Sequence, residues 1–296
     1  MMQLFLFFLL SCMNDYGIHT EKVYEDVIQY EDPGEVWIDS FIQSGETSGV
    51  DIVWVVDRSG SMHDNDEKLV AGIAAMMNAL PLDIGWRIGI ISTDDNESVS
   101  NNSFPLVPGD TPQDAEYMLN NLSVSFKEAG FESIITYMDY GAYASTWMRY
   151  DASLLAVFVS DEDEQSVNIT PAEFVSWIRS RRGFVNVASI VLTDESDCDF
   201  NIAPGNNYID ATNSMSGVII DICSDDWSSG VKDASRSMEP IEYLELTYTP
   251  VPETIVVFVN NKEYSDWSYS SDTNILTFTA IPIQGDLVEI GYNIKE

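Results

Sequence analysis

The chain has 296 residues, 45% of them hydrophobic, and its 49 acidic side chains against 13 Lys and Arg give a formal net charge of −36. This length predicts one large domain or two of moderate size, with ample apolar material for a core. Because phosphate binding requires clustered basic side chains, the charge excludes nucleic acid as an expected partner. It also argues against attachment to an anionic membrane surface by charge.

The N-terminus begins with an apolar run, residues 4–10, that is too short to span a bilayer and is typical of a signal-peptide core. It continues as Leu-Leu-Ser-Cys12, which resembles a bacterial lipobox, where cleavage leaves the cysteine as a lipidated N-terminus. An ordinary cleaved signal is the alternative, since no Lys or Arg precedes the run. We expect residues 1–12 to be a signal peptide with a lipobox and 13–35 to be an acidic tether.

Strand-type and helix-type segments alternate through the next two hundred residues. Apolar runs predict strands at 52–56, 87–93, 153–159, 184–192 and 216–222. Helical spacing or helix-start signals predict helices at 68–80, 111–122, 208–215, 227–234 and from about 128 and 170. The alternation predicts an α/β domain over 36–241, with a doubly wound, mostly parallel sheet. Residues 36–43 alternate in polarity and are expected to add a short edge strand.

The pattern changes near residue 242, where helical spacing ends. Short β-type runs follow at close intervals, separated by turn signals such as Asn260-Asn261 and Gly285. We expect residues 242–296 to form a small all-β domain, resembling an immunoglobulin-like sandwich.

Three oxygen-bearing side chains follow the first buried strand: Asp57, Ser59 and Ser61. A carboxylate and two hydroxyls at alternate positions suit a hard divalent cation, which prefers oxygen ligands. Gly60 is expected to let the backbone turn so that both hydroxyls point at one spot. The alternative is a plain strand-end turn in which a serine caps the following helix.

A second acidic position, Asp161, follows the most continuous apolar run of the chain, 153–159. In an open α/β sheet the carboxyl ends of the strands meet at one edge, so Asp161 is expected beside Asp57. The segments Val-Val-Asp57-Arg-Ser-Gly-Ser-Met and Val-Ser-Asp161-Glu-Asp-Glu together resemble von Willebrand factor type A domains, in particular a bacterial lipoprotein branch of that family.

The resemblance implies a Rossmann-like fold and a metal-ion-dependent adhesion site. The implied ligands all offer oxygen: Asp57, Ser59, Ser61, Ser125 and, through a water, Asp161. Ser125 is the family's third hydroxyl when the chain is aligned on Glu-Ala-Gly-Phe-Glu132, with Ser123 as the near alternative; both serines would otherwise only cap a helix. The implied cation is Mg²⁺, with Mn²⁺ or Ca²⁺ as alternatives, and its open position takes an Asp or Glu of a protein partner.

Once Cys12 is set aside, Cys198 and Cys223 remain. An exported protein with two cysteines is expected to pair them, whereas a cytosolic chain would keep two buried thiols. Export would take the protein to the cell envelope, lipid-anchored at an outer membrane or cell surface, or into the medium. The lipid anchor is its only expected membrane contact.

These expectations combine into a metal-ion-dependent binding or adhesion protein that is not an enzyme. A metal-free scaffold of an envelope or virion assembly is the alternative. A metal-dependent hydrolase is less favoured, because the only histidines are His19 and His63 and no hydrolase motif is present.

Overall fold

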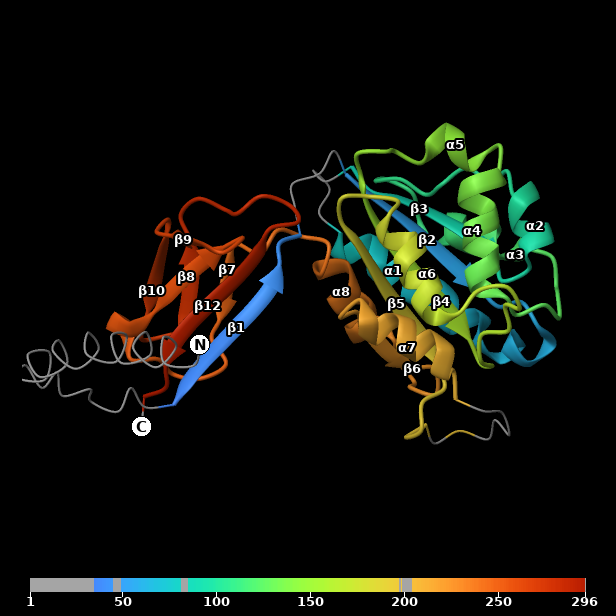
Figure 1. The fold of residues 1–296 in the computed structure, drawn as a ribbon. Coiled ribbons are helices and arrows are strands. Elements are labelled where there is room, and N and C mark those ends of the chain that lie inside the picture. Colours follow the sequence, from blue (N-terminus) through green and yellow to red (C-terminus); the bar gives the residue numbers. More distant parts are fainter. Residues whose placement is uncertain (1–34, 45–48, 81–84, 197, 199–203, 296) are drawn as a thin grey trace, which may run out of the picture.

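The computed structural model describes residues 35–44, 49–80, 85–196, 198 and 204–295, which form two domains (Figure 1). The predicted signal peptide with Cys12 and the tether lie outside the described residues. Within the part that is described, no helix is both long and apolar enough to cross a membrane.

The larger domain is built on a five-stranded parallel sheet with the spatial order β3-β2-β4-β5-β6. Its strands are β2 (Val50–Val56), β3 (Arg87–Ser92), β4 (Ser153–Ser160), β5 (Val185–Val191) and β6 (Val218–Asp221). Every residue of β2 and β4 is buried, as expected for central parallel strands covered on both faces.

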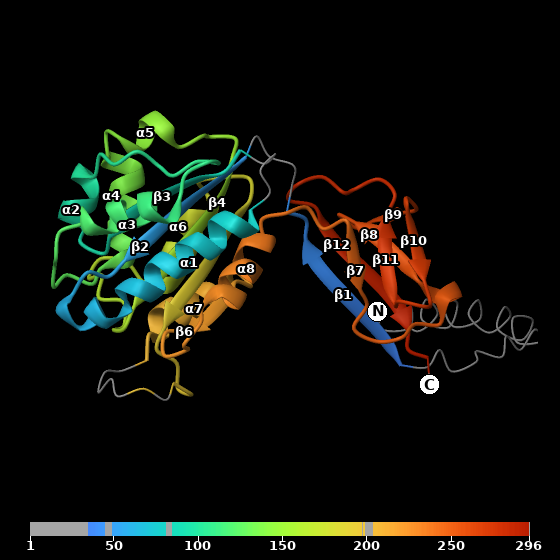
Figure 2. The same ribbon diagram turned by 180° about the vertical axis from the view of Figure 1, so that it is seen from behind.

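Helices cover both faces of this sheet. One face carries α1 (Asp66–Ala79), α3 (Pro112–Asn120) and α8 (Ser228–Arg236), of which α1 and α8 lie in front in Figure 2. The other carries α4 (Gly130–Tyr140), α6 (Pro171–Arg179) and α7 (Asn206–Ser214). A hydrophobic core lies on each face of the sheet, and alternate residues of β2 contribute to the two cores. Trp54 packs with α1, whereas Val53 and Val55 pack with Phe131 of α4. The predicted doubly wound α/β fold is confirmed.

Shorter elements complete the domain. A 3₁₀ turn, η1 (Gly60–Asn65), joins β2 to α1, and α5 (Ala144–Trp147) precedes β4. Helix α2 (Asp95–Ser100) is not among the helices that the sequence predicts. The Asp94 side chain caps it by accepting a hydrogen bond from the Asn96 N–H at 3.0 Å. A disulfide joins Cys198 to Cys223, with Cα atoms 5.6 Å apart, so the predicted pairing is confirmed.

The smaller domain is an all-β sandwich, as predicted. One antiparallel sheet has the order β1-β12-β8-β9 and the other β10-β11-β7. The strands are β1 (Val36–Ile42), β7 (Tyr243–Glu245), β8 (Val256–Val259), β9 (Lys262–Tyr264), β10 (Trp267–Ser270), β11 (Ile275–Phe278) and β12 (Leu287–Asn293), with a 3₁₀ turn η2 (Pro252–Thr254) before β8. Their inward residues share one core that includes Leu276 and Ile290.

Strand β1 corrects the predicted domain boundary at residue 36. It pairs antiparallel with β12 from Val36 to Ile42 instead of adding to the edge of the parallel sheet. Its inward side chains, Trp37 and Phe41, pack on the core of the β domain. The prediction that 36–241 forms one domain is therefore wrong at its start. The chain makes one β-domain strand, forms the whole α/β domain, and returns to complete the sandwich, as Figure 1 shows.

The two chain segments that connect the domains, one after β1 and one before β7, are hydrogen-bonded to each other. Gln43, fully buried just after β1, donates from Nε2 to the Ile241 carbonyl and accepts at Oε1 from the Ile241 N–H, both at 3.0 Å. Next to it, the Ser44 hydroxyl donates to the Glu239 carbonyl. These contacts form a clasp at the domain junction.

Candidate metal centre

The site forms where the two central strands of the parallel sheet end. Val56 of β2 pairs with Val159 of β4, and the Asp57 N–H donates to the Val159 carbonyl at 2.9 Å. The residues that follow, Asp57 and Asp161, are therefore neighbours, and both are fully buried. The carboxyl edge of the sheet brings together two acids that lie far apart in sequence, as expected for an open α/β fold.

Hydrogen bonds connect four of the predicted ligands into one group. Asp57 accepts from the Ser59 N–H at Oδ1 and from the Ser160 hydroxyl at Oδ2, each at 2.7 Å. The Ser59 and Ser61 hydroxyls are 2.9 Å apart, and the Ser61 hydroxyl donates to Asp161 Oδ1 at 3.2 Å. The structure thus gathers the predicted oxygens at one place, while their role as metal ligands stays a prediction.

Gly60 does not play the conformational role expected for it. Its φ lies outside the left-handed region, and an added Cβ would have no neighbouring atom within 4 Å. The turn comes from η1, which any residue can begin, so a glycine is not required here. Gly60 is exposed at the rim of the site, where the lack of a side chain leaves the approach open.

Ser125 lies beside this group but is engaged elsewhere. Its N–H donates to the Arg58 carbonyl at 3.3 Å, which places the loop against the Asp57 motif. Its hydroxyl donates to Asp94 Oδ2 at 2.7 Å, at the end of β3. Ser123, the near alternative, is exposed. The assignment of either serine as the third hydroxyl ligand stays a prediction.

Sequence reasoning missed Glu128, an acid of the same loop that is buried against the loop after β4. Its side chain is buried, and Gln165 Nε2 donates to its Oε2 at 2.5 Å. Burial, contact with the Glu162 carboxyl group and the nearby charge of Asp57 and Asp161 together raise the pKa of Glu128 to about 9. Its place directly before a buried helix start was the only signal in the sequence.

The other two carboxyl groups of the site, those of Asp57 and Asp161, also have raised pKa values. Burial and the charge of Asp57 raise the pKa of Asp161 to about 6. Burial likewise raises the pKa of Asp57. Two basic side chains that are close in sequence to residues of the site form ion pairs elsewhere: Arg58 pairs with Asp66 at 2.5 Å, and Lys127 pairs with Asp95. Buried carboxylates with no cationic partner favour uptake of a proton or a metal ion.

One buried oxygen atom without a hydrogen-bond partner bears on whether a divalent cation fits the site. Asp161 Oδ2 is buried and has no hydrogen-bond partner among the described residues. The surrounding donors are all oxygen, the set that Mg²⁺, Mn²⁺ and Ca²⁺ accept. Across the described ranges, no three Asp, Glu, His or Cys side chains are already arranged as a metal cage, so hydroxyls and water would have to complete the coordination. With that completion, the residues present fit a hard cation.

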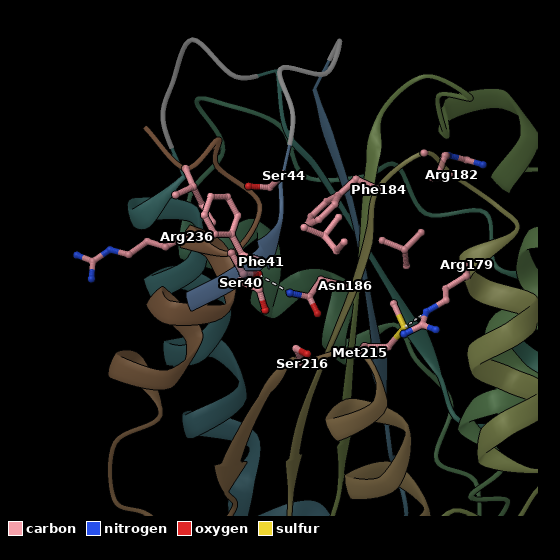
Figure 3. Close-up of a pocket in the computed structure, with 15 residues that line it drawn as sticks. Ser40, Phe41, Ser44, Arg179, Arg182, Phe184, Asn186, Met215, Ser216 and Arg236 are labelled. Atoms are coloured by element: carbon pink, nitrogen blue, oxygen red, sulfur yellow. Dashed lines mark hydrogen bonds between the residues drawn. The ribbon is translucent and has the colours of Figure 1, made fainter. Parts of the chain in front are cut away.

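A pocket with a volume of about 790 Å³ lies between the two domains. Phe41 of the β domain and Phe184 of the α/β domain both line it. Three arginines also line it, but Figure 3 shows Arg182 and Arg236 extending away from each other, and Arg179 bonds the Ser214 carbonyl at 2.6 Å. The guanidinium groups do not converge, so the pocket offers no anion site.

Comparison with known proteins gives remote structural likeness only. No family model and no curated protein matches the sequence. Similar solved structures include a von Willebrand factor type A protein from Catenulispora acidiphila, at 11% identity and a TM-score of 0.43 over 90% of this chain and 67% of that one. A pilus adhesin from Lactobacillus rhamnosus GG is similar at 12% identity and a TM-score of 0.41, over 90% of this chain and 42% of that one.

Proximal thread matrix protein 1 from the mussel byssus, with a zinc-occupied metal-ion-dependent adhesion site, is similar at 12% identity and a TM-score of 0.42, over 69% of this chain and 49% of that one. The structural neighbours are von Willebrand factor type A domain proteins. This chain spans about two thirds of the first neighbour and less than half of the other two. At this identity and TM-score, the likeness concerns the fold and decides nothing about the site.

Proposed function

We propose that this protein is a divalent-cation-dependent binding module of the adhesion type. The proposed ligands are Asp57, Ser59, Ser61 and Asp161, with Ser125 as a further hydroxyl. Mg²⁺ is the proposed ion, and Mn²⁺ and Ca²⁺ are alternatives. The supporting observation is the fully buried Asp161, whose Oδ2 has no partner in the described part of the chain while Oδ1 accepts from Ser61.

Some residues of this chain orient the Asp57 carboxylate, and others lie where a partner could approach the site. Ser160 and the Ser59 N–H fix both oxygens of Asp57, so this carboxylate is orientated before any ligand arrives. Ser61 and Gly60 lie on the solvent side of the group, where a partner could approach. When bound, the cation supplies an electrophilic position that favours a carboxylate, and the proposed partner is a protein that presents Asp or Glu.

The negative net charge of the protein affects how the proposed acidic partner approaches it. A net charge of −36 repels an acidic partner at long range, so attraction arises only close to the cation. Raising the ionic strength screens the repulsion, and removing divalent cations abolishes the attraction. Binding is therefore expected to survive moderate salt and to fail in chelator.

The proposed location is the cell envelope, reached by export and attachment through a lipid on Cys12. The disulfide between Cys198 and Cys223 supports this proposal, because disulfides persist in oxidising compartments. Expression with labelled palmitate, compared between wild type and Cys12→Ala, tests the anchor. Absence of label from the wild-type protein would leave secretion as the alternative.

Thermal melting under titration with Mg²⁺, Mn²⁺ or Ca²⁺ tests the cation site. A cation that binds only the folded state raises the melting temperature as its concentration exceeds the dissociation constant. The rise is expected in wild type and not in Asp57→Ala. If no cation moves the melting temperature of the wild-type protein, the metal-dependent function is wrong, and a metal-free scaffold becomes the better proposal.

A further inference from the structure

Strand β1 is an edge strand, and its pairing shows which of its backbone groups face away from the sheet. Among the described strands it pairs with β12 alone. At one end the Glu35 carbonyl accepts from the Ile294 N–H, and at the other the Gln43 N–H donates to a carbonyl of the same register, both at 2.8 Å. Because bonded and non-bonded residues alternate in an antiparallel pair, the odd-numbered residues of β1 bond to β12. The N–H and C=O groups of the even-numbered residues therefore point to the free edge.

These edge groups are open among the residues that the structure describes. Four exposed residues carry them: Val36, Ile38, Ser40 and Ile42. No hydrogen bond within the described part of the chain reaches their edge-facing groups. Edge strands are normally protected by charged side chains, proline, a bulge or short length. The opposite edge, β9, is short and exposes a Lys and a Glu, whereas β1 has seven residues and no charge on its outer face.

Part of this free edge faces the pocket between the domains. Ser40 and Ile42 line that pocket, together with Phe184 of the α/β domain. Both ribbon views place the α/β domain beside β1, across the junction (Figure 1, Figure 2). A strand added to a sheet lies about 4.8 Å from its neighbour. The pocket therefore suits one extended segment, whereas a second copy of the whole sandwich would meet the α/β domain.

The chain that leads into β1 has the composition of a strand partner. Residues 22–31, outside the described part of the chain, read Lys-Val-Tyr-Glu-Asp-Val-Ile-Gln-Tyr-Glu, and half of them are β-branched or aromatic. Three turn-forming residues, Asp32-Pro33-Gly34, connect them to β1. Strands joined by so short a turn pair antiparallel with each other. Since β12 occupies one edge of β1, this segment can reach only the free edge.

We propose that residues 22–31 bind the free edge of β1 as an added antiparallel strand. A three-residue turn sets residue 31 opposite residue 35, so even-numbered residues of the segment lie opposite even-numbered residues of β1. The outer face then carries four cross-strand pairs: Tyr30 with Val36, Ile28 with Ile38, Asp26 with Ser40, and Tyr24 with Ile42. Apolar side chains meet apolar ones in three pairs and polar meets polar in the fourth, which favours this register.

The added strand has two consequences for the molecule. Tyr24, opposite Ile42, comes to lie at the pocket between the domains, because Ile42 lines it. The segment also withholds the edge of β1 from other chains, which limits aggregation through edge pairing. The expected tether after Cys12 is then shortened to residues 13–21.

Amide hydrogen exchange of the full chain, resolved by residue with NMR, tests the proposal. The N–H groups of Ile38, Ser40 and Ile42 are expected to exchange at least about tenfold more slowly than those of an unstructured chain. The odd-numbered residues of β1 bond to β12 and should be protected in any case, so they report that the strand is folded. Unprotected exchange at Ile38 and Ser40, with the odd-numbered residues protected, would overturn the proposal.

Two proline variants distinguish this segment from any other strand at the edge. Ile28→Pro removes an N–H that faces β1 in the proposed register, and is expected to abolish the protection of Ile38 and Ser40. Gln29→Pro is the matched control, because it removes an N–H that faces solvent, where an edge strand tolerates proline. It should leave the protection in place. Protection that survives Ile28→Pro, or that is lost on dilution, would assign the edge to another strand or to a second copy and overturn the proposal.

Discussion

Arg149 encloses the carboxylate of Asp51 at the start of the central strand β2. Its Nη2 and Nε donate to Asp51 Oδ1 at 2.7 and 3.0 Å, and its backbone N–H donates to Oδ2 at 2.5 Å. Asp51 is fully buried and the Arg149 side chain is 18% exposed, so these bonds are partly shielded from water. The pair lies at the amino end of the strand whose carboxyl end carries Asp57, and it anchors the loop before β4 to the sheet.

Loss of Arg149 is expected to destabilise the α/β domain strongly. Arg149→Met leaves a buried carboxylate without its cation, which typically costs about 3–5 kcal/mol of unfolding free energy. Urea denaturation measures the loss. Arg236→Met is the control, because its pair with Asp233 is exposed and 3.7 Å long, and it is expected to cost no more than about 1 kcal/mol. Similar losses in the two variants would contradict the structural role of Arg149.

Asp161→Asn is expected to have opposite effects with and without a cation. In chelator, removal of an unpaired buried charge is expected to raise the unfolding free energy by about 1 kcal/mol. In saturating Mg²⁺ or Mn²⁺ the same variant is expected to melt below wild type, because an amide is a poorer ligand than a carboxylate. Melting in chelator and in cation, side by side, gives both signs. A loss of stability in chelator would show that Asp161 is already satisfied without a metal.

The sequence predicts the parallel sheet well because its central strands carry their own signal. The runs ending at Val56 and Val159 are apolar on both faces, and this burial is a local property of the chain. The acids that follow them are then brought together by the topology of the sheet alone. The sequence alone therefore predicts that Asp57 and Asp161 lie beside each other.

The missed features depend on distant partners. The alternating pattern of β1 predicts a strand, but not that Trp37 packs on strands formed two hundred residues later. Glu128 looks like a solvated loop acid, and only Glu162 and Gln165, from the loop after β4, make it a buried one. Local patterns do not encode such long-range contacts, which is why the boundary at residue 36 and the burial of Glu128 escaped prediction.

Asp39 makes the attachment of β1 sensitive to acid. Burial raises its pKa, but hydrogen bonds from Thr247, Tyr292 and Trp37 outweigh this effect and hold the pKa below 3.8. A lowered pKa in the folded state contributes stability at neutral pH, and this contribution is lost as the pH falls below about 3.8.

Asp39→Asn is expected to lower the unfolding free energy at pH 7 by about 1–2 kcal/mol, since hydrogen bonds to a charged acceptor become bonds to a neutral one. The gap between the variant and wild type should close as the pH falls below about 3.8, where the wild-type carboxylate is also neutralised. Denaturation at several pH values measures this gap. Exposed Asp272→Asn serves as the control and should show no gap. A gap for Asp39→Asn that stays constant with pH would contradict the assignment.

The clasp at Gln43 is expected to control how tightly the two domains are joined. Gln43→Ala removes both bonds to Ile241, so the Ile241 N–H loses its acceptor and should exchange with solvent faster. Hydrogen exchange, read on peptides covering 237–242, measures this opening, while peptides from β12 should keep their protection. Gln284→Ala is the matched control, because it removes the bond from Gln284 Nε2 to the Ser153 hydroxyl, at 3.2 Å, and leaves the clasp in place. Faster exchange at Ile241 in the control alone would place the junction at Gln284 instead.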